Sequence, residues 1–269
     1  MGLKKFSIAL LISTYNWPEA LHLVLESVRR QYLLPDEVLI ADDGSGEETT
    51  HLIRHFQQDF PVTLHHFWQE DKGFRKTQIM NKAVAASNCD YIIQIDGDIV
   101  LHPSFIADHI SVSEKGTYIK GSRVLLSQPK TRELLHAQRP VSLSAFSTGI
   151  VNRINAMRIP AIASFFVKKR KRSHDLRGCN CAFWRTDFMT VNGYNNDLSG
   201  WGHEDIELAA RFVNLGLLQK RVKMLAVCYH LFHPINSRSE EDANMQVYKK
   251  VVASGEYICT NGVRATQDK

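Results

Sequence analysis

The first hundred residues alternate apolar runs with helical segments, and this alternation constrains the fold more than any other feature. Phe6 to Ser13 is an almost continuous apolar run, typical of a strand buried on both faces. Further strands are predicted at Glu37–Ala41, 62–69 and Asp90–Ile95, and helices between them at 18–31, 48–58 and Arg75–Ser87. Strands and helices in strict alternation predict an α/β fold, with a mostly parallel, doubly wound sheet flanked by helices.

Size and composition set broad limits on the chain. Its 269 residues show no linker-like shift in composition, so we expect a single domain. The net charge of +5 favours anionic partners such as nucleotides, phosphates or membrane surfaces. Five cysteines without zinc-ribbon spacing favour a reducing, cytosolic setting. The apolar run near the start is too short to span a membrane, so we interpret it as the first buried strand.

Ligands of a doubly wound sheet bind beyond the carboxyl ends of its strands. One polar stretch at such an end is Asp96–Gly97–Asp98. The two carboxylates are two residues apart on a strand, so they point the same way and suit a hard divalent cation or the diphosphate bound to it. Gly97 permits close approach of a ligand. An acidic turn without function is the alternative, but the position at a strand end favours a site.

Two other polar stretches, STYN (13–16) and ADDGS (41–45), also follow predicted strands. ADDGS alone could be a solvated turn or a helix cap. Together the two stretches offer hydrogen-bond acceptors for the base and hydroxyls of a nucleoside. Lys72, Arg75 and Lys76 surround a predicted helix N-terminus, where cations suit phosphate oxygens.

The stretch GWGHEDIE (200–207) combines flexible backbone, an aromatic ring and three acids at the start of a helical pattern. Trp201 offers a face that stacks on a sugar ring, while Glu204 and Asp205 can hold hydroxyls and remove a proton. Acids in a first helical turn also favour the helix dipole, and we assign that structural role to Glu207. Capping alone does not explain the Gly-Trp-Gly in front.

A pair of histidines, His230 and His233, follows a predicted late strand at Val222–Tyr229. Either histidine could complete a metal site with the acids, or be a hydrogen-bonded core residue. We prefer His233 as the metal ligand because it lies beyond the strand.

These motifs resemble the family 2 glycosyltransferases of the GT-A fold over about the first 235 residues. LLISTYNWPEALHLVLESVRRQ, VLIADDGS, DKGFRKTQIMNKAV and IIQIDGDIVLHPSFI look like the nucleotide-sugar half of that family. The stretch GCNCAFWRTDFMTVNGYNNDLSGWGHEDIELAARFVNLG resembles the acceptor half shared with β-1,4-galactosyltransferases and bacterial chondroitin polymerase. The resemblance implies a nucleotide-sugar half at 1–115, an acceptor and catalytic half at 116–235, and a helical tail at 236–269.

The resemblance also implies roles for individual residues. Contacts to the nucleoside, taken as uridine, fall to Thr14, Tyr15, Asp42 and Asp43. Arg75 or Lys76 lies near the donor phosphates, Asp96 faces the ribose or donor sugar, and Asp98 binds Mn²⁺ or Mg²⁺. His230 and His233 replace the family's Met-x-x-His pair, which leaves open whether one or both bind metal. On the acceptor side, Glu204, Trp201 and Gly202 hold the acceptor sugar, and Asp205 is the general base.

The middle of the chain carries an apolar stretch followed by five consecutive cations, Lys168–Arg172. One interpretation is a contact with an anionic membrane surface, which suits a lipid-linked acceptor. The other is a solvated mobile loop over the active site. We expect no nucleic-acid partner, because no aromatic platform or nucleic-acid module accompanies the cations.

The sequence therefore predicts a metal-dependent inverting glycosyltransferase. It would move a sugar from a UDP-sugar to a hydroxyl of a glycan or lipid-linked acceptor, in the synthesis of cell-surface polysaccharide or lipopolysaccharide. We expect a cytoplasmic protein, peripheral on the inner face of the cell membrane. The alternatives are a metal-dependent nucleotidyltransferase or phosphohydrolase, and a non-catalytic sugar-nucleotide-binding protein on a membrane surface.

Overall fold

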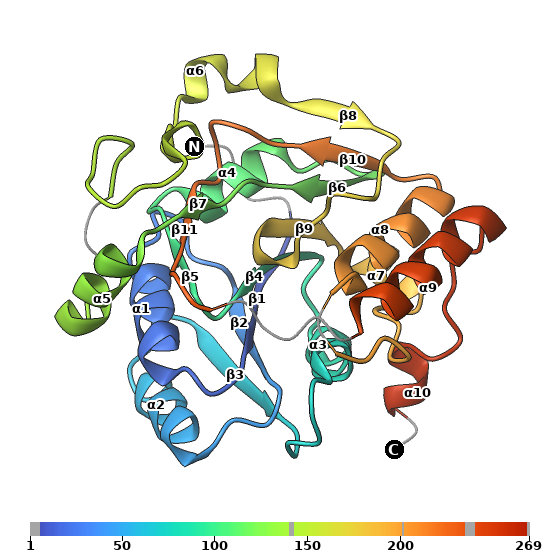
Figure 1. Ribbon diagram of the computed structural model, residues 1–269, viewed down its shortest axis with the longest axis horizontal. Coiled ribbons are helices and arrows are strands. Elements are labelled where there is room, and N and C mark those ends of the chain that lie inside the picture. Colours follow the sequence, from blue (N-terminus) through green and yellow to red (C-terminus); the bar gives the residue numbers. More distant parts are fainter. Residues whose placement is uncertain (1–5, 140–142, 201, 235–239, 268–269) are drawn as a thin grey trace.

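The computed structural model describes residues 6–139, 143–200, 202–234 and 240–267, and shows a large mixed sheet with helices on both faces (Figure 1). The strands of this sheet lie in the order β3 (Thr63–Trp68), β2 (Glu37–Asp42), β1 (Ile8–Thr14), β4 (Tyr91–Asp96), β9 (Cys181–Trp184), β6 (Thr117–Lys120), β10 (Leu218–Arg221) and β8 (Lys168–Arg170). The first four are parallel, as the alternating pattern predicts. Beyond them, β9 and β8 run antiparallel to their neighbours, which makes the sheet mixed.

Helices connect the strands and cover the sheet. The α-helices are α1 (Pro18–Arg29), α2 (Glu47–Gln57), α3 (Lys76–Ala86), α4 (Phe105–Val112), α5 (Gln128–Ala137), α6 (Pro160–Ala163), α7 (Arg185–Thr190), α8 (Glu204–Asn214), α9 (Glu241–Ser254) and α10 (Val263–Gln267). Short 3₁₀ turns are η1 (Arg153–Ala156), η2 (Ser164–Phe166) and η3 (Gly178–Asn180). Within the described ranges, no helix is long and apolar enough to cross a membrane.

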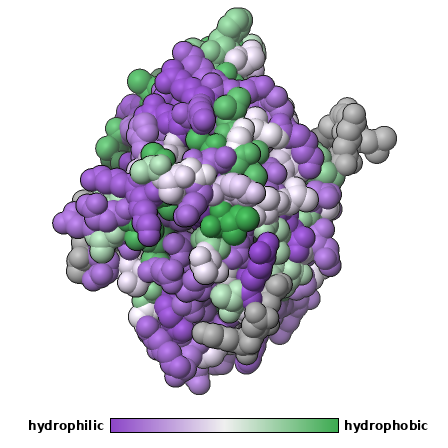
Figure 2. Space-filling model, turned by 90° about the vertical axis from the view of Figure 1, so that its right-hand side faces the viewer, coloured by the Kyte–Doolittle hydropathy of each residue, from purple (hydrophilic) through white to green (hydrophobic). Residues whose placement is uncertain are grey.

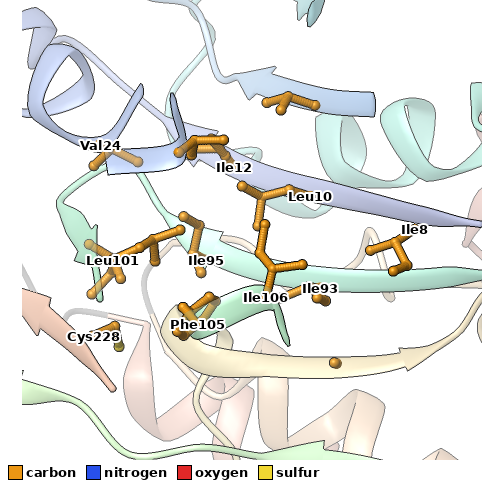
Figure 3. Close-up of a cluster of buried hydrophobic side chains, with 14 of the residues drawn as sticks. Ile8, Leu10, Ile12, Val24, Ile93, Ile95, Leu101, Phe105, Ile106 and Cys228 are labelled. Carbon is orange, nitrogen blue, oxygen red and sulfur yellow. The ribbon is translucent and has the colours of Figure 1, made fainter. Parts of the chain in front are cut away.

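Strand β1 shows why the sheet needs cover on both faces. Its alternate residues Ile8, Leu10 and Ile12 enter one core with α1 and α4, which Figure 3 shows around Val24, Phe105 and Ile106. The intervening Ala9 and Leu11 enter a second core beneath α3 and α8. Because side chains of a strand point alternately to opposite faces, a continuous apolar run is stable only where both faces are buried.

A second, smaller sheet brings distant segments to the end of β4. It has the order β5 (Ile99–Leu101), β11 (Cys228–His230) and β7 (Val124–Leu125). The antiparallel pairing of β5 with β11 sets Ile99 opposite His230. This pairing places the residues just after the acidic end of β4 beside a segment more than a hundred residues further along the chain.

Two expectations for the later chain are corrected. The late strand predicted at Val222–Tyr229 is wrong, because β10 ends at Arg221 and β11 begins only at Cys228. Met224 and Ala226 between them have positive φ angles of 60° and 49°, which interrupt extended backbone. Lys168–Arg170, which one interpretation placed in a solvated loop, form strand β8 paired with β10.

The C-terminal segment packs closely on the rest of the fold. Helix α9 packs on α8, and α10 packs on α3. Asn244 of α9 is buried and donates its side-chain amide to the carbonyl oxygens of Ser199 and Gly202. The five cysteines are all free and buried.

Candidate functional site

The acidic end of β4 and the end of β11 form a cluster with the geometry of a metal site. Asp98, His230 and His233 have ligand atoms that all lie within 4.8 Å of one another. The Nε2 atoms of His230 and His233 are 3.5 Å and 3.3 Å from Asp98 Oδ2. Leu231 donates its backbone N–H to the Asp98 carbonyl at 3.0 Å, so the backbone itself holds the two segments together.

The electrostatics of this cluster suit a cation. The buried Oδ1 of Asp98 has no hydrogen-bond partner among the described residues. Burial and the neighbouring Asp96 raise the pKa of Asp98 to about 7. Burial and Arg123 lower the pKa of His230 to about 4, so the imidazole is neutral and free to ligate. His233 Nδ1 lies 2.6 Å from the Pro234 carbonyl, an arrangement in which a donated N–H turns Nε2 toward Asp98.

Lys76, at the start of α3, joins the strand end to the acids of α8. Its ammonium lies 2.7 Å from Asp96 Oδ1, which also accepts a hydrogen bond from the Ser13 hydroxyl at 2.9 Å. Burial opposes the charge of Lys76, but Asp96, Asp205 and Glu204 together raise its pKa well above the usual value. The charge of Lys76 therefore interacts with acids of both predicted half-sites, one on the strand ends and one on α8.

Glu204 and Asp205 have raised pKa values in this setting. Burial and then the adjacent Asp205 raise the pKa of Glu204 to about 7. Burial also raises the pKa of Asp205, while Lys76 opposes the shift. Carboxylates with raised pKa values are suited to accepting a proton in a reaction.

Asp205 is held in one orientation by residues that the motifs did not reveal. Its Oδ2 accepts the Gly178 N–H at 2.6 Å, and its Oδ1 lies 3.2 Å from the Tyr194 hydroxyl. A Cβ at Gly178 would lie 2.6 Å from Asp205 Oδ1 and from Gln94, so only glycine fits there. The NGY sequence that carries Tyr194 is part of the stretch that resembles the acceptor half of the family. The spacing along the chain does not reveal that the Tyr194 hydroxyl contacts Asp205.

The loop before α8 needs its glycines. Gly200 and Gly202 have φ angles of 70° and 112°, and His203 follows at 72°. This path turns the Gly202 N–H toward Glu204 Oε2 at 3.2 Å. Trp201, the predicted sugar platform, lies outside the described residues.

Glu207 has a structural role, but not the expected one. Its side chain is fully buried and binds the buried guanidinium of Arg211 through two hydrogen bonds of 3.0 and 2.7 Å. Arg211 in turn donates to the carbonyl oxygens of Val191 and Gly193. Glu207 thus anchors the loop that leads to Tyr194, whereas helix capping would have left it at the surface.

The acids after β2 have their oxygens occupied. Asp42 is fully buried, with Oδ1 accepting the Ser45 N–H at 2.8 Å and Oδ2 3.0 Å from His66 Nε2. Asp43 accepts the Gln69 amide at 2.6 Å and the Arg75 N–H at 2.7 Å. Burial raises the pKa of Asp43. Asp42 therefore shapes the turn, and Asp43 ties this turn to the backbone of Arg75.

Three further predicted residues take different positions. Tyr15 is half exposed and its hydroxyl donates to Asp71 Oδ2 at 2.9 Å. Thr14 is buried beside Gly97, whose missing side chain makes room for it, so this glycine serves strand contact as well as ligand approach. The guanidinium of Arg75 turns away to the Glu70 carbonyl, which leaves Lys76 as the cation at the centre of the site.

Arg123, just before β7, is a residue that sequence reasoning missed. It is half buried, and within the described residues its guanidinium forms no ion pair and donates only to the Cys179 thiol, at 3.5 Å. Burial works to lower its pKa, while Cys179, Asp96 and Asp98 raise it. A lone arginine between neighbouring strands carries no motif that a single sequence reveals.

The sequence of this chain matches two family models. Residues 9–188 match the model of glycosyl transferase family 2, and residues 158–234 match that of the N-terminal domain of galactosyltransferase. The first match covers about two thirds of the chain. The chain belongs to glycosyl transferase family 2. The second match bears out the similarity of the acceptor half to galactosyltransferases.

Individual proteins of known name are similar to this chain at low sequence identity. The chondroitin synthase of Escherichia coli is 22% identical over 250 residues, which are 87% of this chain and 36% of that protein. GalNAc-T7, solved with UDP, GalNAc and Mn²⁺, superposes with a TM-score of 0.64 at 14% identity over 94% of this chain and 48% of that one. The mannosyltransferase PcManGT from Pyrobaculum calidifontis, solved with GDP-Man and Mn²⁺, superposes with a TM-score of 0.57 at 14% identity. The match covers 88% of this chain and 59% of that one.

These likenesses confirm the GT-A fold that the resemblance implies, and with it the α/β class that the strand–helix alternation predicts. This family 2 chain spans only about a third of the length of the chondroitin synthase it resembles.

Proposed function

We propose that this protein is a metal-dependent inverting glycosyltransferase that moves a sugar from a UDP-sugar to a hydroxyl of a glycan or lipid-linked acceptor. One observation carries the proposal. Lys76 contacts Asp96 at the donor strand end, and its pKa is also raised by Asp205 and Glu204 at the start of α8. A donor phosphate and an acceptor hydroxyl would therefore meet near Lys76.

Asp98, His230 and His233 would hold the divalent metal. Asp98 Oδ1, which has no partner among the described residues, and the mixed oxygen and nitrogen ligands fit Mn²⁺, and Mg²⁺ is the alternative to test. When bound, such a cation neutralises charge on the diphosphate leaving group. Both histidines, rather than His233 alone, are within reach, so we include both in the site. GalNAc-T7 and PcManGT were each solved with Mn²⁺ beside a nucleotide or nucleotide sugar, which supports a metal in this fold.

The donor would lie over the ends of β1 and β2. Thr14, Tyr15 and Asp43 line the edge where the uridine would bind, and Lys76 faces the phosphates. Asp42, whose oxygens are both bonded within the protein, would contribute by holding the turn. The UDP found with GalNAc-T7 supports uridine, while the GDP-Man of PcManGT shows that the same fold also holds guanosine donors.

Arg123 would assist the leaving group. Its charge lies close enough to Asp96 and Asp98 for both to raise its pKa, and among the described residues its guanidinium donates only to a thiol. A cation with so weak an acceptor has donors to spare for phosphate oxygens, which guanidinium groups bind in pairs.

Asp205 would act as the general base. Gly178 and Tyr194 fix its carboxylate, and its raised pKa makes it basic enough to take a proton from the acceptor hydroxyl. That hydroxyl attacks the anomeric carbon on the face opposite the diphosphate, so the configuration inverts. Glu204 and Gly202 would bind the acceptor sugar.

The wider setting follows from the acceptor. A glycan or lipid-linked acceptor would place the protein in cell-surface polysaccharide or lipopolysaccharide synthesis, on the cytoplasmic face of a membrane. The cations of Lys168–Arg172 support an anionic membrane surface as a partner.

The decisive experiment is a panel of nucleotide sugars with Mn²⁺ or Mg²⁺, followed by thermal shift and by release of UDP in the presence of sugar acceptors. We expect UDP to stabilise the protein only with metal, and one UDP-sugar to be consumed. Product analysis by NMR then checks that the new linkage is inverted. Nucleotide turnover without sugar transfer to any acceptor would favour a nucleotidyltransferase or phosphohydrolase, and binding without turnover a non-catalytic protein.

A further inference from the structure

We propose that the surface formed by residues 144–171, here called the docking face, binds an anionic lipid membrane. The segment crosses the top of the molecule from the loop before η1 to strand β8 (Figure 1). Hydrophobic residues protrude at this same end in Figure 2, where Figure 1 places α6. The docking face carries the exposed side chains of Phe146 (92%), Phe165 (78%), Ile154 (69%), Val151 (63%), Ile162 (39%) and Phe166 (38%).

One side of this segment is nevertheless buried against the rest of the fold. Ile150 and Ala156 are buried in the core that α1 and β11 share, and Ala163 is buried as well. Its exposed apolar residues therefore lie on the outer side of a folded structure. Large apolar side chains gathered on one outer face are a sign of an interaction surface, whereas single exposed ones need no explanation.

The charge of the docking face selects the kind of partner. From 134 to 174 the chain has no Asp or Glu, and eight Lys or Arg. Three of these cations are neutralised by acids outside the segment: Arg158 by Asp108, Lys169 by Glu114 and Arg172 by Asp175.

Lys168, Arg170 and Lys171 remain exposed, with no ion pair among the described residues. Lys168 and Arg170 are two residues apart on β8, so they project to the same side of the sheet edge, opposite to Lys169. Of the five consecutive cations, the structure thus leaves three for an external anion.

Exposed cations on an edge strand would by themselves serve to prevent strand pairing with another chain. That role does not account for the exposed phenylalanines of the same segment. Aromatic rings that enter the headgroup region beside lysines and arginines that meet anionic lipid do account for both. The combination favours a lipid surface over a soluble polyanion, which needs no apolar side chains.

The docking face is tied directly to the catalytic region at both ends. At its start, the Asn152 and Asn155 amides donate to the Arg123 carbonyl, each at 3.0 Å. Shortly after its end, the Gly178 N–H binds Asp205. Membrane binding would therefore hold the site close to the lipid surface, where a lipid-linked acceptor is presented. This link to the acceptor rests on the proposed function, whereas the docking itself does not.

The test is co-sedimentation of the full chain with phosphatidylcholine vesicles, with and without phosphatidylglycerol. Lys168→Gln/Arg170→Gln/Lys171→Gln should reduce binding to the anionic vesicles about fivefold per cation, or roughly 100-fold. Phe146→Ser/Phe165→Ser should reduce it about tenfold or more, because both rings lose apolar burial. Both sets of positions are exposed, so we expect unchanged melting temperatures.

Matched controls separate the docking face from general surface effects. Lys82→Gln/Lys249→Gln/Lys250→Gln removes the same charge from exposed positions on α3 and α9, and Tyr32→Ser/Val252→Ser removes exposed apolar side chains elsewhere. Both controls should bind vesicles like the wild type. Asp98→Asn should also bind vesicles normally, so failure of the proposed activity and failure of docking can be told apart.

Three results would overturn the proposal. One is vesicle binding that is unchanged in both docking-face variants, or reduced equally in the controls. Another is binding to heparin or RNA that depends on the cations while vesicles are ignored. The third is a dimer in light scattering that Phe146→Ser/Phe165→Ser dissociates, which would show that a second copy of the chain covers this face.

Discussion

The ends of β2 and β4 flank the end of β1 in the sheet, and both carry two acids, yet Asp98 differs from the other three. At the end of β2, each oxygen of Asp42 and Asp43 has a partner within the protein. After the end of β4, Asp98 has a buried oxygen that lacks a partner among the described residues. Because an unpartnered buried carboxylate is costly, it indicates a ligand, whereas a satisfied one indicates a structural role.

Helix α8 shows the same contrast within one turn. Glu204 is buried near Asp205, and burial raises its pKa to about 7. Glu207, three residues later, is buried against the guanidinium of Arg211. Similar acids on one helix therefore divide into a group suited to chemistry and a group that holds the fold.

The largest expected effect tests the two strand ends directly. Asp98→Asn should reduce sugar transfer by about 10³-fold or more, because it removes a proposed metal ligand worth several kcal/mol of charge stabilisation. It should also abolish the thermal shift produced by Mn²⁺. Asp42→Asn should reduce activity less than about tenfold and lower the free energy of unfolding by about 1 kcal/mol, because only internal hydrogen bonds weaken. Equal loss of activity in both variants would break the comparison.

Asp205→Asn follows in size. Loss of a general base should lower kcat by about 10²–10⁴-fold. Binding of UDP with metal, measured by calorimetry, should stay within a few fold of the wild type, because Asn keeps the contact with the Gly178 N–H. Turnover that survives in this variant would exclude Asp205 as the base.

Arg123→Gln should have the next largest effect. Without the guanidinium, kcat should fall by about 100-fold, which corresponds to about 3 kcal/mol of lost stabilisation in the transition state. Arg177→Gln, at an exposed position close in the chain to the same site, is the control and should retain activity. If Arg123→Gln changed only the melting temperature, its role would be structural.

The smallest expected effect is a change in the free energy of unfolding, and it has opposite signs for substitutions of Glu204 and Glu207 on α8. The pKa of Glu204 is raised to about 7 in the folded state. At pH values between the usual glutamate pKa and about 7, the folded protein therefore keeps a proton on Glu204 that the unfolded chain has lost. Stability from this group is therefore present at low pH and is lost as pH rises through about 7.

Glu204→Gln should then raise the free energy of unfolding by about 1–3 kcal/mol at pH 8 and by little at pH 5, while sugar transfer falls. Glu207→Gln should instead lower it by about 3 kcal/mol at pH 8, because the buried charge of Arg211 is left without its partner. Chemical unfolding at the two pH values measures both. A loss of stability in Glu204→Gln at pH 8 would contradict a raised pKa of Glu204 in the folded state.

Much of the fold could be predicted because its signals are local. The apolar run of β1 and the helical spacing of α1 each lie within about a dozen residues. The parallel order of the first four strands follows from the strand–helix alternation. The late strand at Val222–Tyr229 was predicted wrongly, because the left-handed backbone at Met224 and Ala226 carries no glycine or proline signal.

The sequence by itself determined the family, the two-sided core and which acids lie at strand ends and at the start of α8. Only the tertiary structure decided which of those acids are satisfied. The partners that decide it are far apart in the chain: His66 for Asp42, Lys76 for Asp96, Gly178 for Asp205, and His230 and His233 for Asp98. The state of a buried charge depends on what surrounds it in space, and spacing along the chain records only its immediate neighbours.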